Sequence, residues 1–139
     1  MIIKNNYLFS GYNETLTAVN GTFQSLNCSR NYLDGQYCFW RIAVTTAEQL
    51  YLIFSSFSVD NENNTDALYV YVGENAEGEA LKVFNGGHPP PKEGICISSN
   101  RIFVAFKSDY AGSFHSFSAS YYVVSNSGEC LRALAGSFS

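Results

Sequence analysis

Short runs of β-branched and aromatic residues, separated by turn-forming residues, recur along this chain of 139 residues. Such runs are typical of β-strands, and apolar positions do not repeat with the 3.6-residue period of a helix over any long window. We therefore predict five strands and two weaker ones. The five lie at 40–44, 49–54, 68–72, 101–106 and 117–124, and the weaker two at 16–19 and 81–84.

The run at 117–124 indicates how these strands sit in the fold. Its apolar side chains share one face, at Phe117, Ala119, Tyr121 and Val123. Ser118 and Ser120 fall on the opposite face, which is the alternation of a half-buried strand. Turn residues separate the runs, and 89–91 is a stiff stretch of three prolines in a loop. Many short strands at near-regular spacing predict an all-β fold, an antiparallel β-sandwich of two sheets.

The composition places the chain among folded domains and excludes several classes of protein. Hydrophobic residues make up 46% of the chain, which is enough for the core of a single domain and excludes intrinsic disorder. No run of about 18 apolar residues occurs, so no membrane span is expected. Charged residues are only 14%, and the net charge of −4 argues against a nucleic-acid binder, which needs a basic surface.

Cysteines and glycosylation sequons both indicate a secreted or extracellular protein. The chain has an even number of cysteines, the four residues Cys28, Cys38, Cys96 and Cys130. They form no CxxC pattern, and no histidine lies at zinc-ligand spacing from them. Two disulfides are therefore expected, in an oxidising compartment, and three pairings are possible. Four N-x-S/T sequons begin at Asn13, Asn20, Asn27 and Asn63. Because residues 1–11 lack the apolar core of a signal peptide, we interpret Met1 as the start of a fragment.

Three carboxylates stand out in a chain with so few charges. Asp60 and Asp66 flank an Asn-rich segment between two predicted strands, and Asp109 follows the strand at 101–106. If the sandwich brings these segments to one end, the three like charges repel unless a cation lies between them. Oxygen ligands without Cys or His favour Ca²⁺ or Mg²⁺ over zinc. The alternative is that all three are solvated turn residues.

The order and spacing of several segments resemble the CUB domain of extracellular proteins. Tyr32-x5-Cys38-x-Trp40-x-Ile42 is similar to one motif of that family. The other similar segments are Leu16-Thr-Ala-Val-Asn-Gly-Thr-Phe-Gln-Ser-Leu-Asn27, the run at 52–60, Asp66-Ala-Leu-Tyr-Val-Tyr-Val-Gly73, and the residues from 107 to 121. The resemblance covers 12–124, about four-fifths of the chain, and implies a jelly-roll-like sandwich. Residues 1–11 would then be an N-terminal extension, and 125–139 a tail that Cys130 ties down.

The resemblance implies a calcium site made of the same three carboxylates, Asp60, Asp66 and Asp109. It adds Tyr32, whose hydroxyl would orient the site, and Ala111, whose backbone carbonyl is a further ligand. In calcium-binding members the ion fixes the loops at one end of the domain, where an acidic residue can face a basic side chain of a protein ligand. The implied function is a non-catalytic protein-interaction module with Ca²⁺ as its cofactor.

The chain departs from the family pattern around this site and at the cysteines. Asp60 stands where Glu is usual, and Asn63 replaces a cysteine in an interval that is shorter than in most members. Gly112 replaces a polar residue and Ser116 the usual Gly. The family partner of Cys38 would lie near Tyr12, where no cysteine exists. The resemblance therefore implies the pairs Cys28–Cys38 and Cys96–Cys130.

No catalytic motif occurs, and neither His88 nor His115 has a nucleophile at a suitable spacing, so we expect no enzyme. Two other functions are compatible with the residues. In one, the chain is a structural subunit of an extracellular assembly that self-associates when residues 1–11 add as a strand to a neighbour. In the other, it is a glycan-binding module that uses exposed aromatic side chains.

Overall fold

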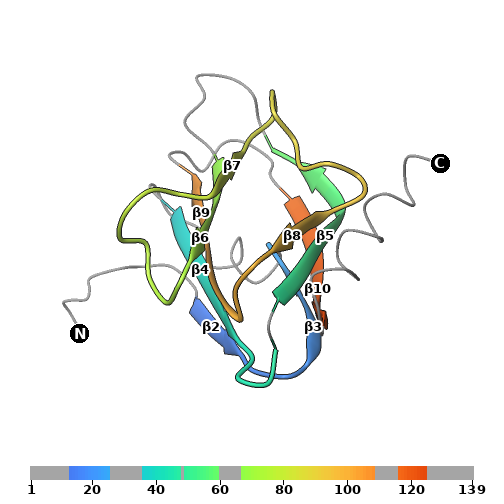
Figure 1. The fold of residues 1–139 in the computed structure, drawn as a ribbon. Coiled ribbons are helices and arrows are strands. Elements are labelled where there is room, and N and C mark those ends of the chain that lie inside the picture. Colours follow the sequence, from blue (N-terminus) through green and yellow to red (C-terminus); the bar gives the residue numbers. More distant parts are fainter. Residues whose placement is uncertain (1–12, 26–35, 48, 60–66, 109–115, 125–139) are drawn as a thin grey trace.

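Two β-sheets stacked face to face make up the computed structural model, which describes residues 13–25, 36–47, 49–59, 67–108 and 116–124 (Figure 1). The four-stranded sheet has the order β3 (Asn20–Gln24), β10 (Ser116–Val124), β5 (Gln49–Ser58) and β8 (Ile95–Ile97). The five-stranded sheet has the order β2 (Asn13–Leu16), β4 (Gln36–Ala43), β9 (Arg101–Ser108), β6 (Ala67–Val72) and β7 (Lys82–Phe84). The predicted two-sheet sandwich is confirmed.

The core lies between the sheets and is built from alternate residues of each strand. In β10, Phe117, Ala119 and Tyr121 are each 1% exposed, as the alternation of that strand predicts. Trp40 of β4 is equally buried, and its ring centroid lies 5.3 Å from that of Phe23 and 5.4 Å from that of Phe117. Aromatic side chains from both sheets therefore meet at the centre, where they bury more surface than aliphatic ones would.

The structure corrects two predictions about strands at the start of the chain. Of the strand predicted at 16–19, only Leu16 lies in a strand, as the last residue of β2, and residues 17–19 form the turn between β2 and β3. The turn is fixed by β10: the Tyr121 hydroxyl donates a hydrogen bond to the Ala18 carbonyl at 2.8 Å, and the Val123 N–H donates to the Val19 carbonyl at 3.1 Å. The sandwich is also not wholly antiparallel, since β2 pairs with β4 in parallel.

A third difference is β8, a three-residue strand that the sequence did not indicate. It pairs with β5 through Ile95 opposite Leu52 and Ile97 opposite Leu50. The predicted domain boundaries lie at residues 11–12 and 124–125, and both the extension at 1–11 and the tail at 125–139 fall outside the described residues. Their roles therefore stay predictions.

Candidate functional site

Strand ends from both sheets meet at one end of the sandwich. In the five-stranded sheet, Ser108 at the end of β9 pairs with Gln36 at the start of β4, and Ala67 at the start of β6 pairs with Lys107. In the four-stranded sheet, the end of β5 pairs with the start of β10 through Ser58 and Ser116. These strand ends gather on the upper side of the view in Figure 1. We call this side of the sandwich the crossover end.

All predicted calcium ligands belong to the three segments that connect strands at the crossover end. Segment 60–66 runs from β5 to β6 and carries Asp60 and Asp66, and segment 109–115 runs from β9 to β10. Tyr32 precedes β4. These ligands, with Asp109 and Ala111, lie outside the described residues. Within the ranges that are described, no three or more His, Cys, Asp and Glu residues are grouped so that they could hold a metal ion.

The crossover end stands on a buried and well-anchored base. Ser25, which is 3% exposed, accepts a hydrogen bond at its Oγ from the Phe117 N–H at 2.9 Å. Its own N–H donates to the Phe117 carbonyl at 3.0 Å. The Phe117 ring packs against those of Phe54 and Phe106, with centroids 6.1 and 5.6 Å away. These contacts join the start of β10 to the residue that follows β3 and to the core.

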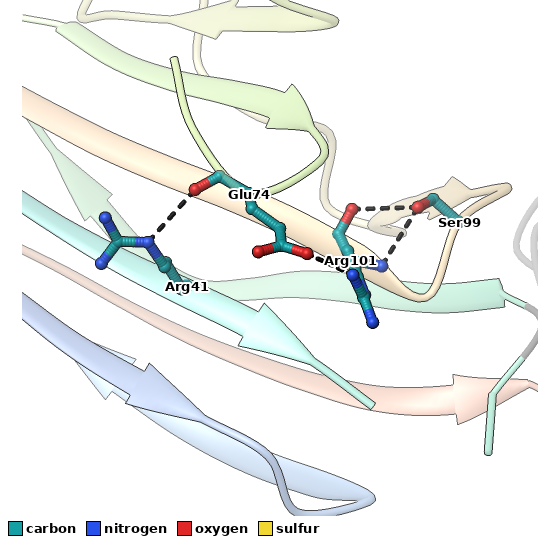
Figure 2. Close-up of polar contacts among 4 residues, drawn as sticks. All are labelled: Arg41, Glu74, Ser99 and Arg101. Carbon is teal, nitrogen blue, oxygen red and sulfur yellow. Dashed lines mark hydrogen bonds and ion pairs between the residues drawn. The ribbon is translucent and has the colours of Figure 1, made fainter. Parts of the chain in front are cut away.

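A separate polar cluster lies at the opposite end of the five-stranded sheet (Figure 2). The Arg101 guanidinium forms an ion pair with the Glu74 carboxylate, and the Arg41 Nε–H donates to the Glu74 carbonyl at 3.1 Å. Ser99 Oγ donates to the Arg101 carbonyl at 2.9 Å and accepts from its N–H at 3.0 Å. The two ion-pair side chains are 45% and 59% exposed, so the pair contributes about 0–1 kcal/mol.

Arg41 of this cluster also lies over two aromatic rings. The Arg41 guanidinium carbon lies 5.2 Å from the ring centroid of Phe39 and 5.4 Å from that of Phe103, on the outer face of the sheet. Phe39 and Phe103 belong to a small second core with Tyr71 and Ala105. Arg41 and Glu74 thus hold the chain after β6 against this core. Sequence reasoning missed these residues because their contacts depend on the strand register, which no motif reveals.

The structure constrains the disulfides without testing the predicted pairs. Cys38 and Cys96 are both disulfide-bonded. Cys38 is fully buried in the core between the sheets, whereas Cys96 packs with Tyr51 and Val124 on the outer face of the four-stranded sheet. Sheets are stacked about 10 Å apart, and disulfide-bonded Cβ atoms lie about 4 Å apart, so these two cysteines are not bonded to each other. The pairs Cys28–Cys38 and Cys96–Cys130 stay predictions.

Two of the four sequon asparagines are described, and both are exposed on strands at the edge of a sheet. Asn13 begins β2 and Asn20 begins β3. Asn27 and Asn63 lie outside the described residues.

The described residues include no helix long and apolar enough to cross a membrane.

Comparisons with known proteins agree with this architecture. The family model of the CUB domain matches residues 11–121. The chain is 35% identical over 108 residues to zinc metalloproteinase nas-39 of Caenorhabditis elegans, covering 76% of this chain and 11% of that protein. It is 33% identical over 110 residues to cubilin of Canis lupus familiaris, covering 76% of this chain and 3% of that protein. The chain thus spans only a small part of the curated relatives it matches.

Solved structures show the same fold. The CUB1-EGF-CUB2 domains of rat MASP-1 superpose with a TM-score of 0.64 and 22% identity, over 81% of this chain and 42% of that one. The MASP-1 CUB2 domain bound to Ca²⁺ gives a TM-score of 0.61 and 20% identity, over 79% of this chain and 97% of that one.

Proposed function

Because the chain belongs to the CUB domain family, we propose that it is a non-catalytic extracellular module that binds a protein partner through segments ordered by calcium. The observation that carries this proposal is the crossover end. The strands flanking 60–66 and 109–115 end side by side in both sheets, so the candidate ligands are tethered to neighbouring points. CUB domains in general are extracellular protein-interaction modules, which supports the wider proposal.

The proposed ligands suit calcium in their chemistry. Asp60, Asp66 and Asp109 supply carboxylate oxygens, and Ala111 supplies a backbone carbonyl, all of which are hard donors that Ca²⁺ prefers. The Tyr32 hydroxyl would orient a carboxylate by hydrogen bonding. Three carboxylates around one divalent ion keep a net negative charge. A basic side chain of the protein partner is therefore the complementary group.

The comparison with MASP-1 supports calcium as the ion. The CUB2 domain of that protein was solved with Ca²⁺ bound. The shared fold covers 97% of that domain and 79% of this chain. The ion in this chain, its ligands and the extracellular location remain part of the proposal. The relative named as a zinc metalloproteinase matches this chain over only 11% of its length, so its activity is not carried over.

Thermal unfolding in Ca²⁺ and in EDTA tests this function. At ten to a hundred times the dissociation constant, a bound ion stabilises the folded state by about 1.5–3 kcal/mol, so we expect a higher Tm in Ca²⁺. Asp109→Asn should abolish this difference because it removes a charged ligand. The matched control is Glu77→Gln, which removes one negative charge from an exposed position outside the crossover end and should keep the difference.

Two results would count against the proposal. Superimposable unfolding curves of the wild-type chain in Ca²⁺ and EDTA would refute calcium binding. Equal loss of the calcium effect in Asp109→Asn and Glu77→Gln would show that the effect reflects overall charge and not a site.

A further inference from the structure

One sequon lies on a sheet face beside an exposed aromatic ring. Asn20, Thr22 and Gln24 are exposed along β3, while Phe23 between them is 4% exposed and points into the core. Asn20 and Thr22, the first and third residues of the sequon, therefore project from the same outer face of the four-stranded sheet. Both groups that an N-glycosylation acceptor needs are on the surface.

Gly21, the middle residue of the sequon, is fixed by packing. A Cβ atom at this position would lie 2.8 Å from Cε1 of the buried Tyr121 ring, which is too close for any real contact. The Tyr121 ring is held by its hydrogen bond to the Ala18 carbonyl, so it has little freedom to yield. The glycine is explained by the core, whereas nothing in the core explains the exposed Asn20 and Thr22 on either side.

Tyr122 is the direct cross-strand neighbour of Asn20. The two residues are paired in the register of β3 and β10, which places their Cβ atoms about 5 Å apart on one face. The Tyr122 side chain is 42% exposed. On its other side, towards β5, the ring packs against Tyr51 with a centroid distance of 5.1 Å. The ring is thus only partly covered by Tyr51, and its strand is the neighbour of the strand that carries Asn20.

Towards β5 and β8 this face carries the apolar cluster of Tyr51, Ile53, Cys96 and Val124, whereas its β3 side is polar and uncharged. Ser120 of β10 is paired with Thr22, and Ser118 is paired with Gln24 on one side and with Ser56 of β5 on the other. Hydroxyl and amide groups of this kind form hydrogen bonds with sugar hydroxyls and acetamido groups, and no side chain of these paired positions carries a charge. The surface next to Tyr122 thus matches the chemistry of a neutral saccharide.

We propose that Asn20 carries an N-linked glycan whose first sugar packs on the Tyr122 ring and covers this face of the four-stranded sheet. The Nδ2 nitrogen of Asn20 attacks the anomeric carbon of an oligosaccharide held on a lipid diphosphate. An N–C bond forms, the C–O bond to the phosphate breaks, Nδ2 loses a proton, and the lipid diphosphate leaves. The proposal goes beyond calcium binding and does not depend on it.

Asn13 provides the comparison within the same chain. Its cross-strand neighbour in β4 is Phe39, which is only 7% exposed and has the Arg41 guanidinium over its ring. A sugar on Asn13 would find no open aromatic face. The structure therefore distinguishes Asn20 from Asn13 by the neighbour that each asparagine has, although both are exposed.

The test uses the full chain secreted from a mammalian cell line. Enzymatic release of N-glycans in heavy-oxygen water, followed by peptide mass mapping, marks each asparagine that carried a sugar, and Asn20 should be marked. Thermal unfolding then compares the wild type with Asn20→Gln, Tyr122→Ala and the double variant. Loss of the glycan should lower Tm by about 3 °C when Tyr122 is present and by much less in the Tyr122→Ala background.

Three control variants separate the glycan from other effects. Thr22→Val removes the sequon without altering Asn20 and should reproduce the Asn20→Gln result. Tyr122→Phe keeps the ring and should keep the full effect of the glycan. Asn13→Gln should change Tm equally with and without Tyr122. An unmarked Asn20 in the secreted protein overturns the proposal, and so does a marked Asn20 whose loss changes Tm equally in both Tyr122 backgrounds.

Discussion

At the scale of single residues, Tyr121 connects the core to the first turn of the chain. Its ring is 1% exposed, it fills the space that Gly21 leaves, and its hydroxyl donates to the Ala18 carbonyl at 2.8 Å. Burial, with a smaller contribution from the charge of Glu14, raises the pKa of the Tyr121 hydroxyl above its ordinary value of 10.0. The neutral form, which can donate the hydrogen bond, is therefore favoured in the folded state.

This pKa shift predicts how stability depends on pH. Because the folded state binds the Tyr121 proton more tightly than the unfolded state, its contribution is complete below pH 10 and is lost as pH rises through the folded pKa. Tyr121→Phe should lower the free energy of unfolding by about 0.5–1.5 kcal/mol near neutral pH and weaken the loss of stability above pH 10.

Urea unfolding of the Tyr121→Phe variant across this pH range provides the measurement. Tyr69→Phe is the control, since the Tyr69 ring stacks on Tyr71 at 6.4 Å and the ring contact survives the substitution. An equal pH dependence in wild type and Tyr121→Phe would contradict the assignment. The pKa of Tyr51 is also raised, by burial and by the nearby Tyr122 and Glu93, so part of the pH dependence should persist in the variant.

At the scale of elements, β8 depends on one close backbone contact. Gly94, immediately before β8, has a φ of +88°, and a Cβ atom there would lie 2.8 Å from the Leu52 carbonyl oxygen of β5. The Tyr51 hydroxyl donates a hydrogen bond to the Glu93 carbonyl beside it. Because the obstructing atom belongs to the backbone of a central strand, it cannot move aside at low cost.

Alanine substitutions at two glycines separate steric contact from backbone strain. Gly78 also has a positive φ, +79°, but no atom of the described residues lies within 4 Å of its Cβ position. Gly78→Ala should cost about 1–2 kcal/mol for the left-handed conformation alone. Gly94→Ala should cost a further 1–3 kcal/mol, roughly, for the overlap. Chemical denaturation measures both, and equal losses in the two variants would refute the importance of the contact with Leu52.

The elements also show how far the sequence predicts this fold. The five long strands follow from continuous β-branched and aromatic runs, because a half-buried strand needs such side chains whatever its partners. β7 and β8 have three residues each, where the pattern is weak, and of these two only β7 was predicted. Residues 17–19, predicted as part of a strand, connect β2 to β3 instead, and β10, about a hundred residues later, supplies the hydrogen bonds that hold them. Parallel pairing of β2 with β4 likewise depends on distant contacts.

At the scale of the whole molecule, the topology accounts for the candidate site. Segments 60–66 and 109–115 each connect a strand of one sheet to a strand of the other, and the strand ends that flank them are neighbours. The sequence predicted Asp60, Asp66 and Asp109 as a set because charged residues are few and these three lie in segments between predicted strands. It could not predict that Ser25 and Phe117 anchor the base below them, since that contact joins residues 92 positions apart.

The most direct test of the account is a calcium titration of the isotope-labelled chain, followed by amide nitrogen–proton NMR. We predict saturable shifts with a dissociation constant on the order of 10⁻⁴–10⁻³ M, as in extracellular calcium modules. They should be largest at the crossover end, at Val59, Ala67 and Ser116, and absent at Gly21 and Val44, which lie at the opposite end. Shifts that do not saturate, or that are as large at Gly21 and Val44, would contradict a calcium site at the crossover end.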